Sequence, residues 1–343
     1  MTSSETTYSQ FMHLSAGLRV TKDDDSKVRF FPFSKNEAVE VPEFPLEKFG
    51  EILVGAGLHC IGNEERLWCD GYEDQVWIPA LIRGVGDKIG EWPGHDWAAL
   101  GHAHHKREES EQRRFSSAAS FHLIGSARRL MHVSEWYHQM LLYVHLKNLA
   151  DTVSFRNSDH TNFLIDCQSF LTEVGSARDY ISGYAAFAIA GLTNISTFRG
   201  LWKNREGLPA KLRSIVEEAW QDSNEKLTLK HIGRYRDEIV HQRPITELSD
   251  GGFKITSHDI GLSKPLRGVK FDIQVWPHEK PDVKFDALRQ FHAMMRVLYL
   301  FGRAVIALAP IEPEMPVINL AKQAGRIPPK TTRRVSYPRK MES

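Results

Sequence analysis

The chain has 343 residues, with 44 basic and 43 acidic side chains, so its formal net charge is +1. At about 100–200 residues per domain, this length predicts two domains or one large one. Hydrophobic residues make up 41% and aromatic residues 10%, which excludes a wholly disordered chain, and the balanced charge excludes a strongly basic, histone-like protein.

The first 115 residues differ in composition from the rest of the chain. Glycine and proline recur through them and separate short apolar runs, such as residues 52–54 and 76–81, which predicts short strands and turns in a smaller mixed α/β or β-rich region of unknown role. The N-terminus has no basic segment followed by an apolar one, so we expect no secretory signal. Three cysteines without a Cys-x-x-Cys pair favour a reducing, cytoplasmic location without a disulfide framework.

Histidines gather in the segment WPGHDWAALGHAHH, residues 92–105. Imidazoles and a carboxylate within ten residues are suitable zinc ligands, which would make the protein a metal-dependent hydrolase. Adjacent histidines do not converge readily on one ion, however, and the segment lacks a recognised ligand spacing. We therefore expect a solvated polar loop here, and neither a metal nor another cofactor.

Residues 116–315 are expected to form a helical bundle with an inserted β-hairpin, so the fold class is mainly α. Apolar residues recur there at helical spacing with few glycines or prolines, and Gly125 predicts an interruption of the first helix. The most apolar stretch, residues 293–310, contains two arginines, so no membrane span is predicted. The expected elements, in chain order, are helices over residues 120–149, 161–192, 210–222, 227–242 and 286–309, a loop over 200–209, and hairpin strands over 253–256 and 269–276.

A basic tail, residues 316–343, is expected to be flexible. From residue 321 onward it holds seven basic residues and one acidic residue, a charge of +6 that leaves −5 on the rest of the chain. Such a tail either contacts phosphates or stays solvated without a partner, and its charge does not decide between the two.

The segment HIGRYRDEIVHQRP, residues 231–244, carries the most informative pattern. At about 100° per residue, Arg236 falls inside an apolar face, whereas Glu238 and His241 fall on the polar side. A guanidinium in an apolar stripe is costly unless it is paired or used. His241 lies at the helix end, just before the proline that stops the helix, so we expect it to be exposed. The apolar face comprises Ile232, Tyr235, Ile239 and Val240.

An acidic stripe on the helix over residues 161–192 offers a partner for Arg236. Asp166, Glu173 and Tyr180 recur every seven residues along the edge of the apolar face of that helix. A carboxylate there would hold the guanidinium by a charge-assisted hydrogen bond, and Glu173, near the middle of the helix, is the preferred mate. The alternative is that these carboxylates reach solvent or a neighbouring helix.

The run Arg236-Asp237-Glu238-Ile239-Val240-His241 resembles the Arg-x4-His signature of HEPN domains, which are all-helical and frequently act as metal-independent ribonucleases. The acidic helix before the motif and the helix after it also resemble that family, over residues 116–310. The resemblance implies a homodimer that brings two motifs together and RNA as the substrate. It further implies a toxin or phage-defence effector with an antitoxin or other regulatory partner. Because no membrane span is predicted, we expect no membrane association.

The resemblance also implies roles for individual residues. RNA cleavage without metal uses the ribose 2′-OH as nucleophile and leaves a 2′,3′-cyclic phosphate and a 5′-hydroxyl. His241 would manage protons, because histidine titrates near neutral pH, and Arg236 would stabilise charge on the phosphate. Asp237 would orient either side chain, and Glu173 is a further catalytic candidate. The expected substrate-binding residues flank the motif: Arg234 and Arg243.

Two other interpretations stay open. In the first interpretation, Arg236 belongs to a structural ion pair and His241 is a surface histidine. Alternatively, the chain would be a catalytically inactive, dimeric HEPN-like scaffold that binds RNA without cleaving it, because some members of the family are silent.

Overall fold

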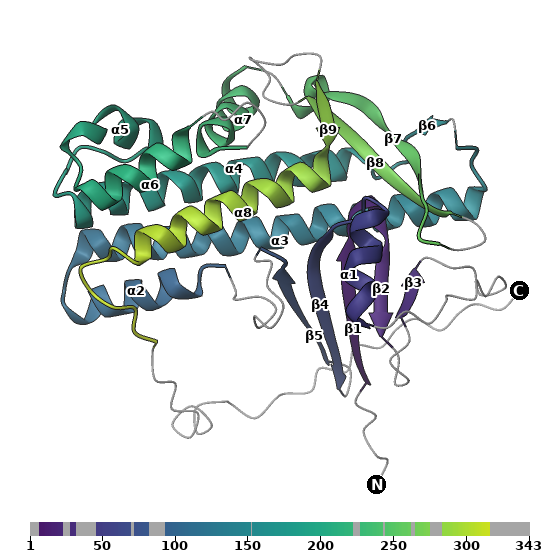
Figure 1. Ribbon diagram of the computed structural model, residues 1–343, viewed down its shortest axis with the longest axis horizontal. Helices are drawn as coiled ribbons and strands as arrows, with labels where there is room; N and C mark the ends of the chain where they lie inside the picture. The colour runs from purple at the N-terminus through teal and green to yellow at the C-terminus, as the bar shows by residue number, and fades with distance from the viewer. Residues whose placement is uncertain are drawn as a thin grey trace, which may run out of the picture.

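The computed structural model of the chain describes residues 7–22, 28–31, 46–69, 72–81, 93–151, 153–221, 227–242, 244–261, 265–274 and 283–315. Within these ranges the fold is mainly helical and contains two small antiparallel sheets (Figure 1). The expected basic tail, residues 316–343, and Arg243 lie outside the described residues.

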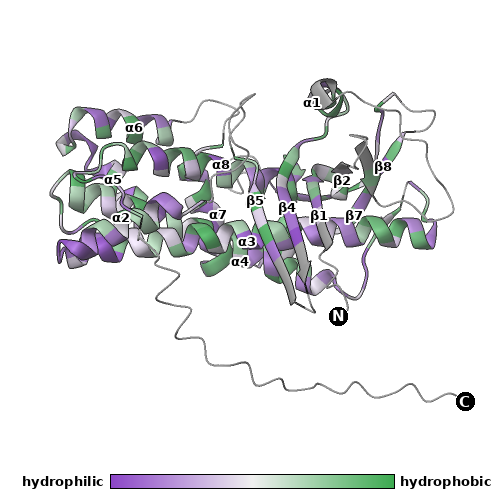
Figure 2. Cartoon of the chain, turned by 90° about the horizontal axis from the view of Figure 1, so that it is seen from below, coloured by the Kyte–Doolittle hydropathy of each residue, from purple (hydrophilic) through white to green (hydrophobic). Residues whose placement is uncertain are grey.

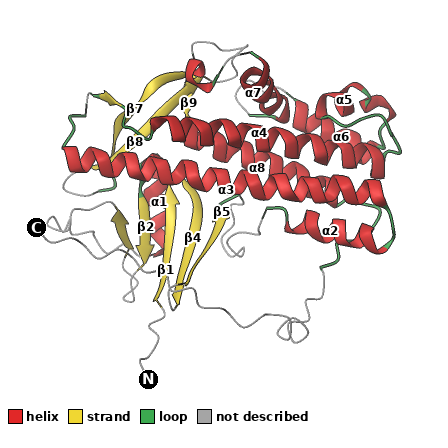
Figure 3. Cartoon of the chain, turned by 180° about the vertical axis from the view of Figure 1, so that it is seen from behind, coloured by secondary structure: helices red, strands yellow, loops and turns green. Residues whose placement is uncertain are grey.

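Two long antiparallel helices, α3 (Ser110–Lys147) and α4 (His160–Tyr184), form the axis of the molecule. The helix α8 (Ala287–Ile306) packs against both of them, and α2 (His95–Lys106) packs along the first half of α3. Three shorter helices lie together over α4, as Figure 3 shows from behind: α5 (Phe198–Lys203), α6 (Ala210–Trp220) and α7 (Leu229–His241). The helices expected over residues 161–192, 210–222, 227–242 and 286–309 are thus confirmed to within a few residues, α4 being continued by a π-helical turn at Ala185–Ile189.

The N-terminal region forms a five-stranded antiparallel sheet with the strand order β3-β2-β1-β4-β5. A helix, α1 (Leu46–Gly55), joins β3 to β4, and its Phe49 ring packs 5.8 Å from Phe30. This arrangement confirms the expected mixed region and the strand expected at residues 76–81, which overlaps β5, but the strand expected at residues 52–54 is wrong because that run lies in α1. The strands are β1 (Thr7–Leu14), β2 (Arg19–Lys22), β3 (Val28–Phe31), β4 (Cys60–Cys69) and β5 (Tyr72–Pro79).

The expected hairpin is present as β7 (Ser249–His258) and β8 (Leu266–Gln274), with Phe253 opposite Phe271. Two short strands, β6 (Ser154–Phe155) and β9 (Lys284–Asp286), extend it on either side and were not predicted. The Phe253 and Phe271 rings lie 4.9 and 4.8 Å from the ring of Phe163 on α4, and so fix the hairpin against the helical axis.

The buried residues of both sheets and of the helices belong to one continuous core. The expected domain limit between residues 115 and 116 falls inside α3, whose 38 residues contact the N-terminal sheet, α4 and β8 alike. Hydrophilic and hydrophobic stretches both occur along the long helices (Figure 2). None of the described helices combines the length and the apolar character needed to cross a membrane.

Three expected irregularities are wrong, each for a local reason. The helix α3 starts at Ser110 and runs through Gly125 without a break, because the missing side chain makes room for the Glu173 carboxylate, 3.0 Å from a Cβ built there. The expected loop over 200–209 contains α5 and a 3-10 turn, because the Thr197 side chain caps α5 by accepting the Gly200 N–H.

The expected polar loop at residues 92–105 is the helix α2. It begins directly after Gly94, whose φ of +106° lies in the left-handed region that favours glycine. Its Trp97, Leu100 and His104 are buried at the spacing of a helix face, which shows that the histidine-rich stretch is amphipathic.

Candidate functional site

The motif helix α7 is fixed by its buried face and by its first turn. Ile232, Tyr235 and Ile239 are buried, and the Tyr235 hydroxyl donates a 2.7 Å hydrogen bond to the carbonyl of Gln274 at the end of β8. A capping box at Thr228 closes the first turn. These contacts set the rotation of α7 about its axis and therefore the direction in which each polar side chain leaves it.

The buried face of α7 is rotated from the predicted one. Val240, expected inside, is 45% exposed, and Glu238, expected on the polar side, is 2% exposed. The face centres near Tyr235 because that ring is the part of α7 that packs deepest. Arg236 therefore lies at the edge of the apolar face and not within it.

Arg236 packs its stem on α4. A Cβ built on Gly175 would lie 2.9–3.0 Å from Cβ, Cγ and Cδ of Arg236, so the glycine is what lets the arginine lie against the α4 backbone. The side chain is 34% exposed, and its buried Nε has no hydrogen-bond partner among the described residues. Its only ion pair within those residues is with Asp237, at 3.6 Å. The guanidinium thus keeps donors for another acceptor.

Asp237 and His241 both face outward. The Asp237 side chain is 55% exposed, and His241 is exposed in the last turn of α7, as predicted. Five residues of an α-helix separate Arg236 from His241, which corresponds to about 140° of rotation and about 7.5 Å of rise. Within one chain their side chains therefore leave α7 in different directions.

Glu173 is not the mate of Arg236. Its carboxylate lies 2.6 Å from Nδ1 of His122 on α3, and the His122 ring stacks on Tyr180 with centroids 5.3 Å apart. Glu173 and Gly175 are two residues apart, so they project from nearly opposite sides of α4, one toward α3 and the other toward α7. The acidic stripe is satisfied by a neighbouring helix, which was the alternative interpretation.

The same holds for the other carboxylate of the stripe. Asp166 accepts hydrogen bonds from Arg129 at 2.7 Å and from the Trp136 indole N–H at 2.8 Å, both on α3. These α3 partners were missed by the sequence reasoning. A signal was available, because His122, Arg129 and Trp136 recur at seven-residue intervals along α3 and match the spacing of the stripe on α4.

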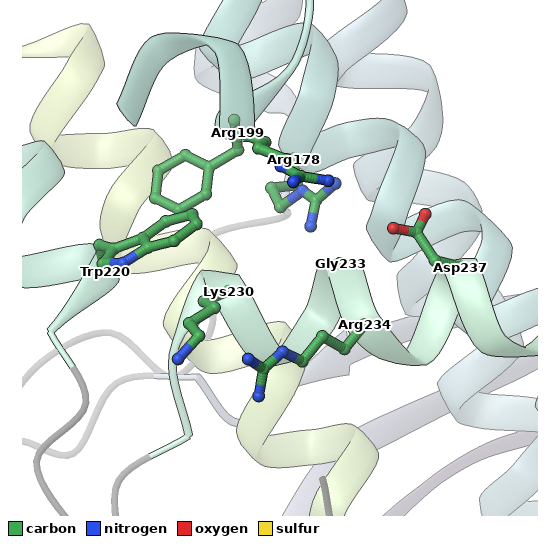
Figure 4. A pocket seen from close by; sticks show the side chains of 8 residues that line it. Arg178, Arg199, Trp220, Lys230, Gly233, Arg234 and Asp237 are labelled. Atoms are coloured by element: carbon green, nitrogen blue, oxygen red, sulfur yellow. The ribbon is translucent and has the colours of Figure 1, made fainter. Parts of the chain in front are cut away.

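Arg234 lies at a cavity of about 290 Å³ on the side of α7 away from the sheets, shown in Figure 4. Asp237 lines the same cavity, whereas Arg236 and His241 do not line it. The lining side chains are Arg178 from α4, Phe198 and Arg199 from α5, Trp220 from α6, and Lys230, Gly233, Arg234 and Asp237 from α7. The structure therefore brings two of the predicted site residues together in a basic pocket that the sequence did not reveal.

The histidine-rich helix α2 does not form a metal centre. Within the described ranges, no group of three or more His, Cys, Asp or Glu side chains is arranged to hold a metal ion. His104 is instead a buried packing residue, hydrogen-bonded through Nδ1 to Glu109 at 2.5 Å and through Nε2 to the Tyr184 hydroxyl at 2.9 Å.

A second polar network lies between the N-terminal sheet and α3. The His13 imidazole joins Ser134, at 3.0 Å from Nδ1, and Glu64, at 2.7 Å from Nε2, in the order of a Ser-His-acid triad. All three residues are at most 2% exposed, so no substrate reaches the serine, and the network is structural. Burial lowers the pKa of His13 from 6.5 to about 4.

Comparison of this chain with family models, with curated proteins and with solved structures finds no match. Function is therefore inferred from the residues of α7 and from the side chains around it.

Proposed function

We propose that the protein is a HEPN-like endoribonuclease that cleaves RNA without a metal, through Arg236 and His241. The observation that supports this is the state of Arg236, which is partly exposed at the edge of a packed face with a buried Nε that no described group accepts from. A structural arginine in such a position is normally paired, because an unmatched buried donor costs about 1–3 kcal/mol. The motif also lies at the exposed end of a helix.

His241 and Arg236 have separate roles in the proposed reaction. The 2′-oxygen attacks the adjacent phosphorus, its proton passes to the neutral imidazole of His241, and the bond from phosphorus to the 5′-oxygen breaks. The departing 5′-oxygen takes a proton from solvent and the imidazolium of His241 returns its proton to solvent, so the products are a 2′,3′-cyclic phosphate and a 5′-hydroxyl, and no water is consumed. The planar guanidinium of Arg236 binds the phosphate oxygens as their charge grows.

A second copy of the chain completes the site in this proposal. Arg236 and His241 diverge by about 140° around α7, so one subunit alone does not direct both at a single phosphate. A two-fold pairing that brings two α7 helices together would place Arg236 of one subunit beside His241 of the other. The exposed side chains of Asp237 and Val240 lie on the part of α7 that such a pairing would cover.

The test measures degradation of a labelled RNA in EDTA by the wild type, His241→Ala and Arg236→Lys. The lysine variant keeps a stem on Gly175 and a charge but loses the planar fork. Both variants are expected to lose activity by at least about 100-fold, the lower range for a general acid–base group. The matched controls are His145→Ala, an exposed histidine in the last turn of α3, and Arg296→Lys on α8, and both should retain activity.

Subunit mixing tests the composite site directly. A heterodimer of Arg236→Ala and His241→Ala subunits contains one site with both native residues if each site combines two chains, and none if each site lies within one chain. Recovery of activity on mixing two inactive variants is therefore expected. Equal RNA degradation by the wild type and both single variants would refute the proposed function, and an inactive mixture would refute the composite site.

A further inference from the structure

We propose that the cavity lined by α4, α5, α6 and α7 is a nucleotide-binding pocket that takes a phosphate and a base together. This inference goes beyond the proposed cleavage activity and does not depend on it, because neither Arg236 nor His241 lines the cavity. It rests on three observations: a buried guanidinium held in place, further basic residues in the lining of the cavity, and aromatic residues in the same lining (Figure 4).

The buried guanidinium is that of Arg178, which is 6% exposed. It donates to the carboxylate of Asp179 through Nε and Nη2, at 3.0 and 2.8 Å, and to the carbonyl of Leu229 through Nη1, at 3.2 Å. A Cβ built on Gly233 would lie 1.9 Å from Nη1, so only a glycine at that position of α7 admits the guanidinium. The base of the pocket is therefore a preformed, rigid donor group.

Three further cations line the cavity. Lys230 and Arg234 lie four residues apart on one face of α7, and Arg199 comes from α5 (Figure 4). Like charges four residues apart on a helix repel and destabilise it slightly. Among the lining residues four are basic and Asp237 is the single carboxylate, a composition that favours an anionic ligand.

The aromatic residues of the lining indicate that the ligand also contains a flat, stacking group. Trp220 stacks on Trp202 with centroids 4.7 Å apart and planes inclined by 4°, and Phe198 lies 5.8 Å from Trp220. Arg205 lies 4.3 Å from the centroid of Trp202 on the same stack. This stack fixes the Trp220 ring, which lines the cavity together with Phe198, so that aromatic side chains stand beside the cations. A base stacking on that ring while its phosphate meets the cations fits both parts of the pocket.

The volume of the cavity limits how many nucleotides it can hold. A volume of about 290 Å³ lies at the lower end of the range for small-molecule pockets, which is about 300–1,000 Å³. It suits one nucleotide unit and not an extended ligand. That unit comes either from a free mononucleotide or from an unpaired position of an RNA strand, and both present the same phosphate and base.

The test is calorimetric titration of the full-length protein with AMP, adenosine, inorganic phosphate and a 2′-O-methyl adenosine hexamer, which has no 2′-OH and so is not cleaved. AMP or the hexamer is expected to bind at least about tenfold more tightly than adenosine or phosphate, because two contacts act together. Lys230→Gln and Arg234→Gln should each weaken that binding about tenfold, by loss of a charge-assisted hydrogen bond. Trp220→Leu should weaken it about tenfold without changing phosphate binding.

Two control variants guard against misfolding. Lys230→Arg keeps the charge and should keep the affinity, and Lys147→Gln, an exposed lysine at the far end of α3, should bind as the wild type does. Tighter binding of AMP than of the hexamer would assign the pocket to a free nucleotide, and the reverse to an RNA strand, and either result supports the proposal. Failure of AMP and the hexamer to bind at millimolar concentration, or equal affinity in wild type and Trp220→Leu, would overturn it. Neither result depends on RNA cleavage.

Discussion

Acid should destabilise this protein through His13, the imidazole buried between the N-terminal sheet and α3. Arg19 and Arg66 face Glu64 and Glu135 around it, so two cations and two carboxylates already balance. A proton added to His13 would be an extra charge at a fully buried position. Burial, reinforced by Arg19, therefore lowers the pKa of His13 from 6.5 to about 4, although the bond to Glu64 opposes the shift.

The sign and size of the effect follow from proton linkage. The unfolded chain binds a proton near pH 6.5 and the folded chain only near pH 4, so the stability is present at neutral pH and is lost as pH falls between these two pKa values. Between pH 7 and pH 5, His13 alone should lower the free energy of unfolding by about 2 kcal/mol. His138, whose pKa burial also lowers to about 4, acts in the same direction. Asp286 opposes them, because burial raises its pKa to about 6.

Urea unfolding at pH 7 and pH 5 measures this directly, with His13→Gln beside the wild type. Glutamine keeps a donor for Glu64 and an acceptor for Ser134 but does not titrate, so the pH-dependent loss should shrink by about 2 kcal/mol. The control Ser134→Ala removes a hydrogen bond and leaves the imidazole in place. It should lower stability by about 1 kcal/mol at both pH values. An unchanged pH dependence in His13→Gln would refute the assignment of His13 as a buried neutral group.

Three further substitutions test the packing around the sites. Gly175→Ala should displace Arg236 from α4 and reduce RNA cleavage at least about tenfold while circular dichroism stays native, since overpacking a tight contact costs about 1–3 kcal/mol. Gly233→Ala should push the Arg178 guanidinium aside, lower the melting temperature and weaken nucleotide binding, which thermal shift and calorimetry would show. Tyr137→Phe should lower the free energy of urea unfolding by about 1–3 kcal/mol, because the lost hydroxyl donates to a buried carboxylate at 2.6 Å and accepts two backbone N–H groups.

The helices were predictable where regular apolar spacing continues through the element. The bounds of α4, α6, α7 and α8 follow from apolar spacing, and the ends of α7 and α8 also follow from Pro244 and Pro310 beyond them. The start of α3 was missed because its first ten residues are largely polar, and the contacts that bury Phe115 come from other elements, α2 and the end of α4. A glycine inside a helix also misled the prediction. At Gly125 it makes space for a side chain of the next helix, which no single-helix pattern records.

The sequence predicted which side chains of one helix are exposed, but not which residues of neighbouring helices they contact. The exposure of His241 follows from the α7 wheel, whereas the edge position of Arg236 and the partner of Glu173 depend on how α7 and α4 are rotated against their neighbours. The basic pocket was not predictable for the same reason. Its residues come from four helices, and Arg178 looks like an ordinary surface residue of α4 until Gly233 of α7 is placed beside it.

The pocket and the motif are connected by one face of α7. Lys230, Arg234, Asp237 and His241 project within about 60° of one another, over a length of about 16 Å. An RNA strand with one nucleotide in the pocket would therefore pass along this face toward His241, and a mononucleotide in the pocket would take the place of that nucleotide. AMP should accordingly inhibit cleavage of a short RNA competitively, raising KM with kcat unchanged. Trp220→Leu should relieve that inhibition. Inhibition through kcat alone would instead mean that the pocket acts on the motif from a separate site.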